Sequence, residues 1–109
     1  MSLESIQKEV DEWTEQFSPQ YWPALEMMAR LAEETGEVAR EINHMYGTKK
    51  KKPMEDTKDL GQELSDVLFT ICCIANSHGI NLQAEWDRMM HEKQYGRDNQ
   101  RYDKKETSQ

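Results

Sequence analysis

Residues 23–46 read PALEMMARLAEETGEVAREINHMY, and this stretch decides the fold class. Its apolar residues recur at helical spacing and form one stripe, made of Ala24, Met27, Met28, Leu31, Val38, Ile42 and Met45. This period predicts an amphipathic α-helix that turns one face to a core. Because Pro23 suits a first helical turn and Gly47 is a common helix stop, we expect one helix over the whole stretch.

The same pattern predicts three more helices outside this stretch. Apolar spacing places them over about residues 2–17, 57–78 and 82–94. Gly79 and Ile80 are suited to end the third helix, and Asn81 is suited to cap the fourth. With no alternating apolar run that would predict a strand, we expect an all-α four-helix bundle over residues 1–95. Residues 96–109 are expected to form a polar, mobile tail.

The supply of apolar residues predicts an oligomer. The chain has 109 residues, which suffices for one domain, and 36 % of them are apolar. This share is low for a domain of such a size, which buries only about two thirds of the surface of its unfolded chain. We therefore expect the helices to complete their core against another copy of the chain.

The charge of the chain limits its partners. The net charge is −7, from 21 acidic and 14 basic residues. An acidic balance argues against a nucleic acid polymer as partner, because proteins that bind its phosphate backbone are basic. A small phosphorylated substrate stays possible, since cations held by carboxylates reverse the local charge. For the four lysines at residues 49–52, a solvated loop is favoured over a site that steers polyphosphate.

The cysteines and the apolar runs predict a cytoplasmic protein. Cys72 and Cys73 are adjacent and have no further cysteine to pair with, so we interpret them as small core residues in a reducing compartment. The first ten residues contain no apolar stretch that resembles a signal peptide. The longest nearly apolar run, residues 67–75, is too short to span a membrane, and no membrane partner is expected.

Two pairs of acidic residues are the candidates for chemistry. Glu34 and Glu37 stand three residues apart in one predicted helix, as Glu63 and Asp66 do in another. Residues at this spacing are neighbours on a helix face. On a helical wheel of about 100° per residue, each pair lies on the same flank of the apolar stripe of its helix. If the two helices pack as antiparallel neighbours, the four carboxylates converge at the rim of the core.

Such convergence calls for a counter-charge. Two unit charges about 5 Å apart repel by roughly 3 kcal/mol at an effective dielectric near 20. Oxygen ligands without paired His or Cys favour Mg²⁺, with Mn²⁺ as a substitute. The alternative is a non-enzymatic helical interaction module with a solvated acidic face, on which Arg30 pairs with Glu33 and Glu34. Because the two motifs match in geometry, we favour the metal site.

Two other features have weaker interpretations. Glu41 and His44 show the Glu-x-x-His spacing of di-iron bundles, but a di-iron site needs two such runs and the sequence has one. Iron in the purified protein would revive this alternative. Trp22 and Trp86 are able to stack on a base, yet core packing is the commoner role of an aromatic residue at helical spacing, and we favour it here.

The two acidic motifs, taken with their flanks, resemble a known family. LAEETGE at residues 31–37 and ELSDVL at residues 63–68 are similar to the signatures of the MazG-like, all-α nucleotide pyrophosphohydrolases, and the resemblance covers roughly residues 22–97. It implies a Mg²⁺-dependent hydrolase that converts a nucleoside triphosphate and water to the monophosphate and pyrophosphate. It also implies a homodimer or homotetramer, and clearing non-standard nucleotides is the expected task.

The resemblance further implies a role for each matching position. The metal ligands of the family match Glu34, Glu37, Glu63 and Asp66. Glu33 matches the leading Glu, which orients the catalytic water or acts as its base. The family's downstream phosphate-binding motif is matched in part: Lys93 and Arg97 are carried over as substrate-binding residues. Gln94 replaces the usual Asn of this motif and its Tyr-Pro is missing.

Overall fold

The computed structural model describes residues 1–48 and 59–106. It contains four α-helices: α1 (Leu3–Thr14), α2 (Ala24–Tyr46), α3 (Leu60–Ser77) and α4 (Leu82–Met89). The fourth continues directly into a π-helical stretch, η1 (Met90–Arg97), and a 3₁₀ turn, η2 (Asp98–Gln100). The described residues contain no strand, so the predicted all-α class is confirmed. The four lysines at residues 49–52 and the predicted helix start near residue 57 lie outside the described residues.

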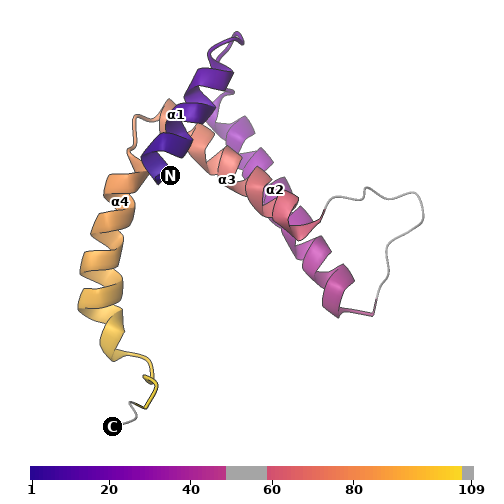
Figure 1. The fold of residues 1–109 in the computed structure, drawn as a ribbon. Coiled ribbons are helices and arrows are strands. Elements are labelled where there is room, and N and C mark those ends of the chain that lie inside the picture. The colour runs from indigo at the N-terminus through magenta and orange to yellow at the C-terminus, as the bar shows by residue number, and fades with distance from the viewer. Residues whose placement is uncertain (49–58, 107–109) are drawn as a thin grey trace.

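The body of the molecule consists of α1, α2 and α3. Helices α2 and α3 run antiparallel and form the most extensive helix pair, and α1 packs on α3 near its C-terminal end (Figure 1). The apolar core between them is small and consists of Val10, Met27, Cys72 and Ala75. Cys72 is fully buried, as predicted for a core residue. None of the described helices combines the length and the apolar character needed to cross a membrane.

Helix α4 projects away from this body (Figure 1). Only its beginning is fastened to α1: Gln7 Oε1 accepts a hydrogen bond from the Leu82 N–H at 2.7 Å, and Gln83 Oε1 accepts one from the Leu3 N–H at 2.9 Å. The radius of gyration is 18.1 Å, against about 13 Å for a compact chain of this length. The predicted four helices are therefore present, but they do not close into one bundle within a single chain.

The link between α3 and α4 follows the predicted signals. Gly79 has a φ of +67°, the left-handed conformation that glycine adopts at low cost. The Ile80 N–H donates to the carbonyl of Ala75 at 2.9 Å, which is the hydrogen bond of a Schellman cap. Asn81 then caps α4, because its Oδ1 accepts from the Ala84 N–H at 3.1 Å. The stop at Gly79 and the cap at Asn81 are confirmed.

A polar network joins α1, α3 and the segment between α1 and α2. Gln7 Nε2 donates to Asn76 Oδ1 at 2.9 Å, and Asn76 Nδ2 donates to the Tyr21 hydroxyl at 3.0 Å. That hydroxyl donates in turn to Asp11 Oδ1 at 2.6 Å. Burial and this hydrogen bond to Asp11 raise the pKa of Tyr21. The network fixes Tyr21, and with it the segment that leads into α2.

The helix that starts at α4 extends further than predicted. The sequence suggested an end near residue 94, whereas η1 reaches Arg97. Asp98 follows and is 6 % exposed, with Arg97 Nε at 3.0 Å and Arg101 Nη1 at 3.2 Å from its Oδ1. The hydrogen bond from Arg97 and that from Arg101 hold the pKa of Asp98 below its usual range. Residues 107–109 lie outside the described residues, and the division into a domain and a tail stays a prediction.

Candidate metal centre

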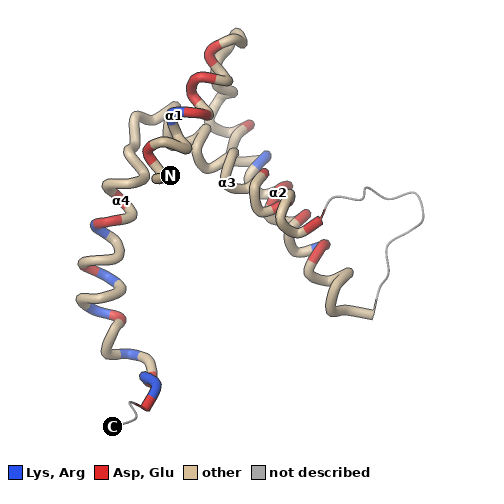
Figure 2. The backbone as a smooth tube through the Cα atoms, in the orientation of Figure 1, with Lys and Arg blue, Asp and Glu red and all other residues tan. Residues whose placement is uncertain are grey.

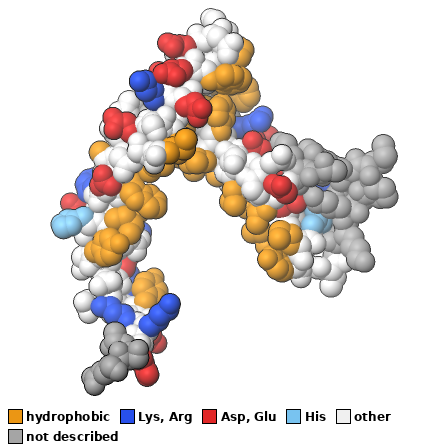
Figure 3. All heavy atoms as spheres, in the orientation of Figure 1, with side chains coloured by type: hydrophobic (Ala, Val, Ile, Leu, Met, Phe, Trp, Pro, Cys, Tyr) orange, Lys and Arg blue, Asp and Glu red, His pale blue; other side chains and the backbone are white. Residues whose placement is uncertain are grey.

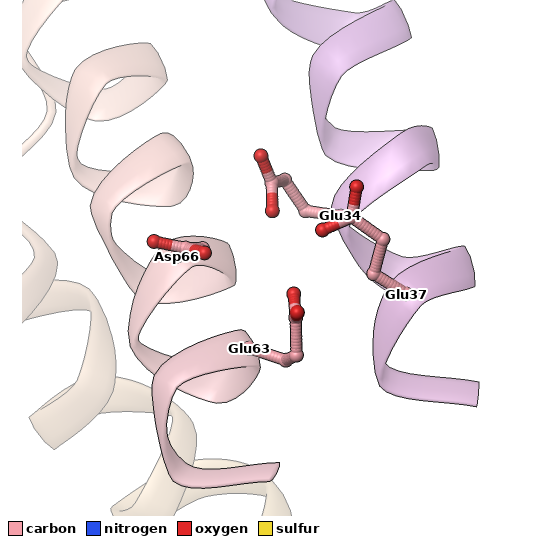
Figure 4. A group of neighbouring side chains, drawn as sticks. All are labelled: Glu34, Glu37, Glu63 and Asp66. Carbon is pink, nitrogen blue, oxygen red and sulfur yellow. The ribbon is translucent and has the colours of Figure 1, made fainter. Parts of the chain in front are cut away.

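Four carboxylates meet between α2 and α3. Glu34 and Glu37 lie one turn apart on α2, and Glu63 and Asp66 lie one turn apart on α3. Because the helices are antiparallel neighbours, these side chains point toward one another (Figure 4). One carboxylate oxygen from each residue lies within 4.8 Å of those from the other three. The helical wheel predicted this convergence on the condition that the two helices pack as antiparallel neighbours, which they do; the role of the four residues as metal ligands stays a prediction.

Two members of the group are buried. Glu34 is 4 % exposed and Glu63 is 5 % exposed, while Asp66 is half-buried and Glu37 is exposed. Arg30 Nε lies 2.7 Å from Glu34 Oε1, but the other carboxylate oxygen, Glu34 Oε2, is buried and has no hydrogen-bond partner. Since buried charged oxygens are normally paired, this atom is suited to bind a cation.

The donor set fits a hard divalent cation. At 4.8 Å and an effective dielectric near 20, two carboxylates repel by about 3.5 kcal/mol. Arg30 offsets part of this repulsion through its contact with Glu34 Oε1. The group offers oxygen atoms alone, which is the ligand type that Mg²⁺ and Mn²⁺ prefer. Within the part of the chain that the structure describes, this is the one group of acidic, His or Cys residues that could hold a metal ion, and Glu41 and His44 do not belong to it.

A pocket of about 420 Å³ adjoins the carboxylates. Its wall comes from α1, the segment between α1 and α2, α2 and α3, and it includes Glu34 and Asp66. Five aromatic rings contribute to the same wall: Trp13, Phe17, Tyr21, Trp22 and Phe69. The Trp13 ring packs edge-on against Phe17 and Phe69, at centroid distances of 4.9 and 5.9 Å. The pocket is therefore aromatic on one side and acidic on the other.

Neither Trp22 nor Trp86 lies in the core of a single chain. Trp22 is 52 % exposed and lines the pocket, and Trp86 is 50 % exposed on α4. Trp22 directly precedes Pro23, so it belongs to the segment before α2 and not to the apolar stripe of a helix. This position was the signal in the sequence that pointed away from a core role.

Arg30 connects the two sides of the pocket. Its pairing with Glu34, which the sequence offered as part of a surface acidic face, is present as an i,i+4 contact at 2.7 Å. Its guanidinium carbon also lies 5.9 Å from the centroid of the Trp22 ring, within cation–π range. Within residues 1–48 and 59–106, Arg30 is the one basic residue that lines the pocket. The pairing was readable from spacing, but the stacking on Trp22 was not.

Two titratable groups in the pocket wall are neutral near pH 7. Burial raises the pKa of the Cys73 thiol to about 11, with a smaller contribution from Cys72. The pKa of Tyr21 is raised as well. Because the thiolate is the nucleophilic form of cysteine, Cys73 is unsuited to attack a substrate. The chemistry of the site therefore falls to its carboxylates.

Three of the predicted site residues lie outside the group of four. Glu33 is exposed and adjacent to Glu34 on α2. Lys93 and Arg97 belong to η1, which packs on α4 and η2 and extends away from α2 and α3. Figure 2 shows the basic residues of this arm well separated from the acidic residues of the body. A single chain thus does not bring Lys93 and Arg97 to the carboxylates.

Comparison with known proteins identifies the family. Residues 23–102 match the model of the MazG nucleotide pyrophosphohydrolase domain. The chain is 50 % identical over 105 residues to YpjD of Bacillus subtilis, a match that covers 96 % of this chain and 94 % of YpjD.

Two crystal structures resemble the fold. The structure of YPJD from Bacillus subtilis superposes with a TM-score of 0.75 at 49 % identity, covering 85 % of this chain and 95 % of that one. A Bacillus-conserved MazG protein, described as a nucleotide pyrophosphohydrolase, superposes with a TM-score of 0.71 at 41 % identity, covering 85 % and 89 %. The chain with four converging carboxylates therefore belongs to the MazG nucleotide pyrophosphohydrolase family, and is an enzyme of that class.

Proposed function

We propose that this enzyme is a Mg²⁺-dependent nucleoside triphosphate pyrophosphohydrolase. It converts an NTP or dNTP and water to the monophosphate and pyrophosphate. The observation that carries the proposal is the junction of two chemically different surfaces, because the carboxylates Glu34 and Asp66 belong to the wall of an aromatic pocket. An aromatic wall suits a base, and a carboxylate group that holds cations suits a polyphosphate.

The metal ligands in this proposal are Glu34, Glu37, Glu63 and Asp66. Bound Mg²⁺, for which Mn²⁺ can substitute, neutralises phosphate charge and lowers the pKa of water. Arg30 keeps Oε1 of Glu34 engaged and leaves Oε2 to the cation. Glu33, exposed and next to Glu34, accepts the proton of the water that attacks the α-phosphorus. Pyrophosphate then departs as the leaving group.

The base of the substrate occupies the aromatic side of the pocket. A volume of about 420 Å³ is within the range of small-molecule sites, which is about 300–1,000 Å³. Stacking of a base on an aromatic side chain contributes about 1–3 kcal/mol and tolerates changes in the base, because every base has a π face. Recognition by stacking supports a role in clearing non-standard nucleotides. The free cysteines Cys72 and Cys73 support a reducing compartment, and we propose the cytoplasm.

The functional unit in this proposal is a homodimer or homotetramer. The accessible surface of one chain is 9003 Å², against about 6,300 Å² for a compact monomer of 12.9 kDa. Hydrophobic side chains gather on the concave side of the arch that α4 forms with the body (Figure 3). A second chain covers this surface, and its η1 brings Lys93 and Arg97 to the phosphates.

Pyrophosphate release from a panel of canonical and modified nucleoside triphosphates tests the proposal. We expect release in Mg²⁺, matched by formation of the monophosphate, and none in EDTA. Glu37→Gln removes one carboxylate of the group and should abolish the release. Glu26→Gln is the matched control, because Glu26 is an exposed residue of the same helix outside the group. Absence of turnover on every member, by a folded protein, would instead support a non-enzymatic interaction module.

A further inference from the structure

Arg30 occupies the junction between the aromatic and the acidic sides of the pocket. It lines the pocket, its Nε contacts Glu34, and its guanidinium carbon lies over the Trp22 ring at 5.9 Å from the centroid. Its side chain is 50 % exposed, so a ligand in the pocket can reach it. An ion pair and a cation–π contact thus fix the position of a group that stays accessible.

The guanidinium of Arg30 has N–H donors beyond the one that contacts Glu34. An arginine carries five N–H donors, and the contact with Glu34 Oε1 engages the one on Nε. The cation–π contact with Trp22 uses none of the N–H donors, so the donors on the two terminal nitrogens stay available for hydrogen bonds. The edge of a guanidinium fits two oxygens of a phosphate, and this geometry makes arginine suited to phosphate binding.

The charges around the pocket create the need for such a donor. A substrate with its base against the aromatic rings and its terminal phosphates at the carboxylates brings its α-phosphate close to Arg30, because this residue contacts both Trp22 and Glu34. Carboxylates repel phosphate oxygens, and among the described residues that line the pocket Arg30 is the one basic side chain. Lys93 and Arg97, the predicted phosphate-binding residues, lie on η1, which packs on α4 and η2.

We propose that Arg30 binds the α-phosphate of the substrate, the group between the sugar and the leaving pyrophosphate. This inference rests on the proposed function and adds a residue to it. Arg30 holds the phosphate that is attacked while its Nε keeps Glu34 in place. Binding of the nucleotide therefore depends on Arg30 through its phosphate and not through its base.

Equilibrium binding separates the two contributions. The probes are the α,β-imido analogue of the triphosphate that the wild type turns over fastest, in Mg²⁺, and the matching nucleoside, which has no phosphate. Isothermal titration calorimetry gives the Kd of each. We expect Arg30→Gln to weaken binding of the analogue about 10- to 100-fold, the usual effect of a lost hydrogen bond to a charged group. Binding of the nucleoside should stay within about twofold, because stacking does not need the guanidinium.

Two further variants keep the test sharp. Arg30→Lys preserves the charge beside Glu34 but loses the planar fork, so it too should lose affinity for the analogue and keep affinity for the nucleoside. It carries the test if Arg30→Gln fails to fold, since that variant leaves a buried carboxylate without its partner. Arg88→Gln is the control: Arg88 is an exposed arginine paired with Glu85 on α4, and neither Kd should change.

Equal losses for the analogue and the nucleoside would overturn the inference, since Arg30 would then only shape the pocket through Trp22. Unchanged affinity for the analogue in both Arg30 variants would overturn it as well. Failure of the proposed function looks different: the wild type itself would turn over no triphosphate and bind no analogue, and the inference would fall with it.

Discussion

Mg²⁺ should raise the melting temperature of this protein, and Glu37→Gln should largely remove the rise. A cation that binds only the folded state stabilises it by RT ln(1 + [Mg²⁺]/Kd), which is about 1.4 kcal/mol at ten times Kd. Unfolding entropy of about 2.1 cal/mol/K per residue gives roughly 230 cal/mol/K for 109 residues. The expected rise is the ratio of these quantities, about 6 °C.

Glu37 is the suitable member of the group to change, because it is the exposed one and its replacement costs little packing. Loss of one metal ligand should lower the affinity for the cation by at least about 10- to 100-fold. This is the effect of losing a residue that only hydrogen-bonds to a ligand. At the same Mg²⁺ concentration the stabilisation then falls to about 0.4 kcal/mol or less, equivalent to a rise of about 2 °C. Without Mg²⁺ the variant should melt no lower than the wild type, since one source of repulsion within 4.8 Å is gone.

The assay is calorimetric melting in MgCl₂ and in NaCl of equal ionic strength, which removes general screening from the comparison. Glu26→Gln, on the same helix and outside the group, should melt like the wild type in both salts. A wild type that melts alike in the two salts would refute the metal site. Equal Mg²⁺ responses in Glu26→Gln and Glu37→Gln would refute the assignment of Glu37.

Three further outcomes are expected. Asn76→Ala should lower stability by about 1–3 kcal/mol, because Gln7 and the Tyr21 hydroxyl lose a partner; an unchanged thermal melt would contradict this. Asp98→Asn should destabilise the protein at pH 7. The difference in stability between variant and wild type should shrink as the pH falls below about 4, the pKa of an aspartate in the unfolded chain. It should vanish below the lowered pKa of Asp98 in the folded protein, because the wild type then loses the charge as well. Urea melts at several pH values check this. Cys73, with a pKa of about 11, should be about 10⁻³ thiolate at pH 8 and be alkylated far more slowly in the folded than in the unfolded protein, as mass spectrometry would record.

Features governed by neighbours in sequence could be predicted. The stop at Gly79 and the cap at Asn81 each depend on a few consecutive residues, and both are present. The convergence of Glu34 with Glu63 needed only helical spacing and the antiparallel packing of two helices, because a residue at a known angle from an apolar stripe has a known place at the rim of the core.

Features assembled from several segments could not be predicted. The pocket takes Trp13 from α1, Trp22 from the segment before α2, and Phe69 from α3, and no local pattern states that these rings meet. The amphipathic pattern of α4 likewise does not predict the direction in which the helix projects. The pattern predicts that one face is covered, but not whether the same chain or another one covers it.

The attachment of α4 by its first turn alone has a consequence for hydrogen exchange. Beyond the contacts of Leu82 and Gln83 with α1, the backbone amides of this arm depend on the stability of a single helix. Helices of that length are marginal in water on their own, so these amides should exchange within the dead time of dilute samples while those of α2 and α3 stay protected. If the proposed second chain covers α4, the exchange of these amides should slow as the protein concentration rises, and α4 would then report on how many chains are together.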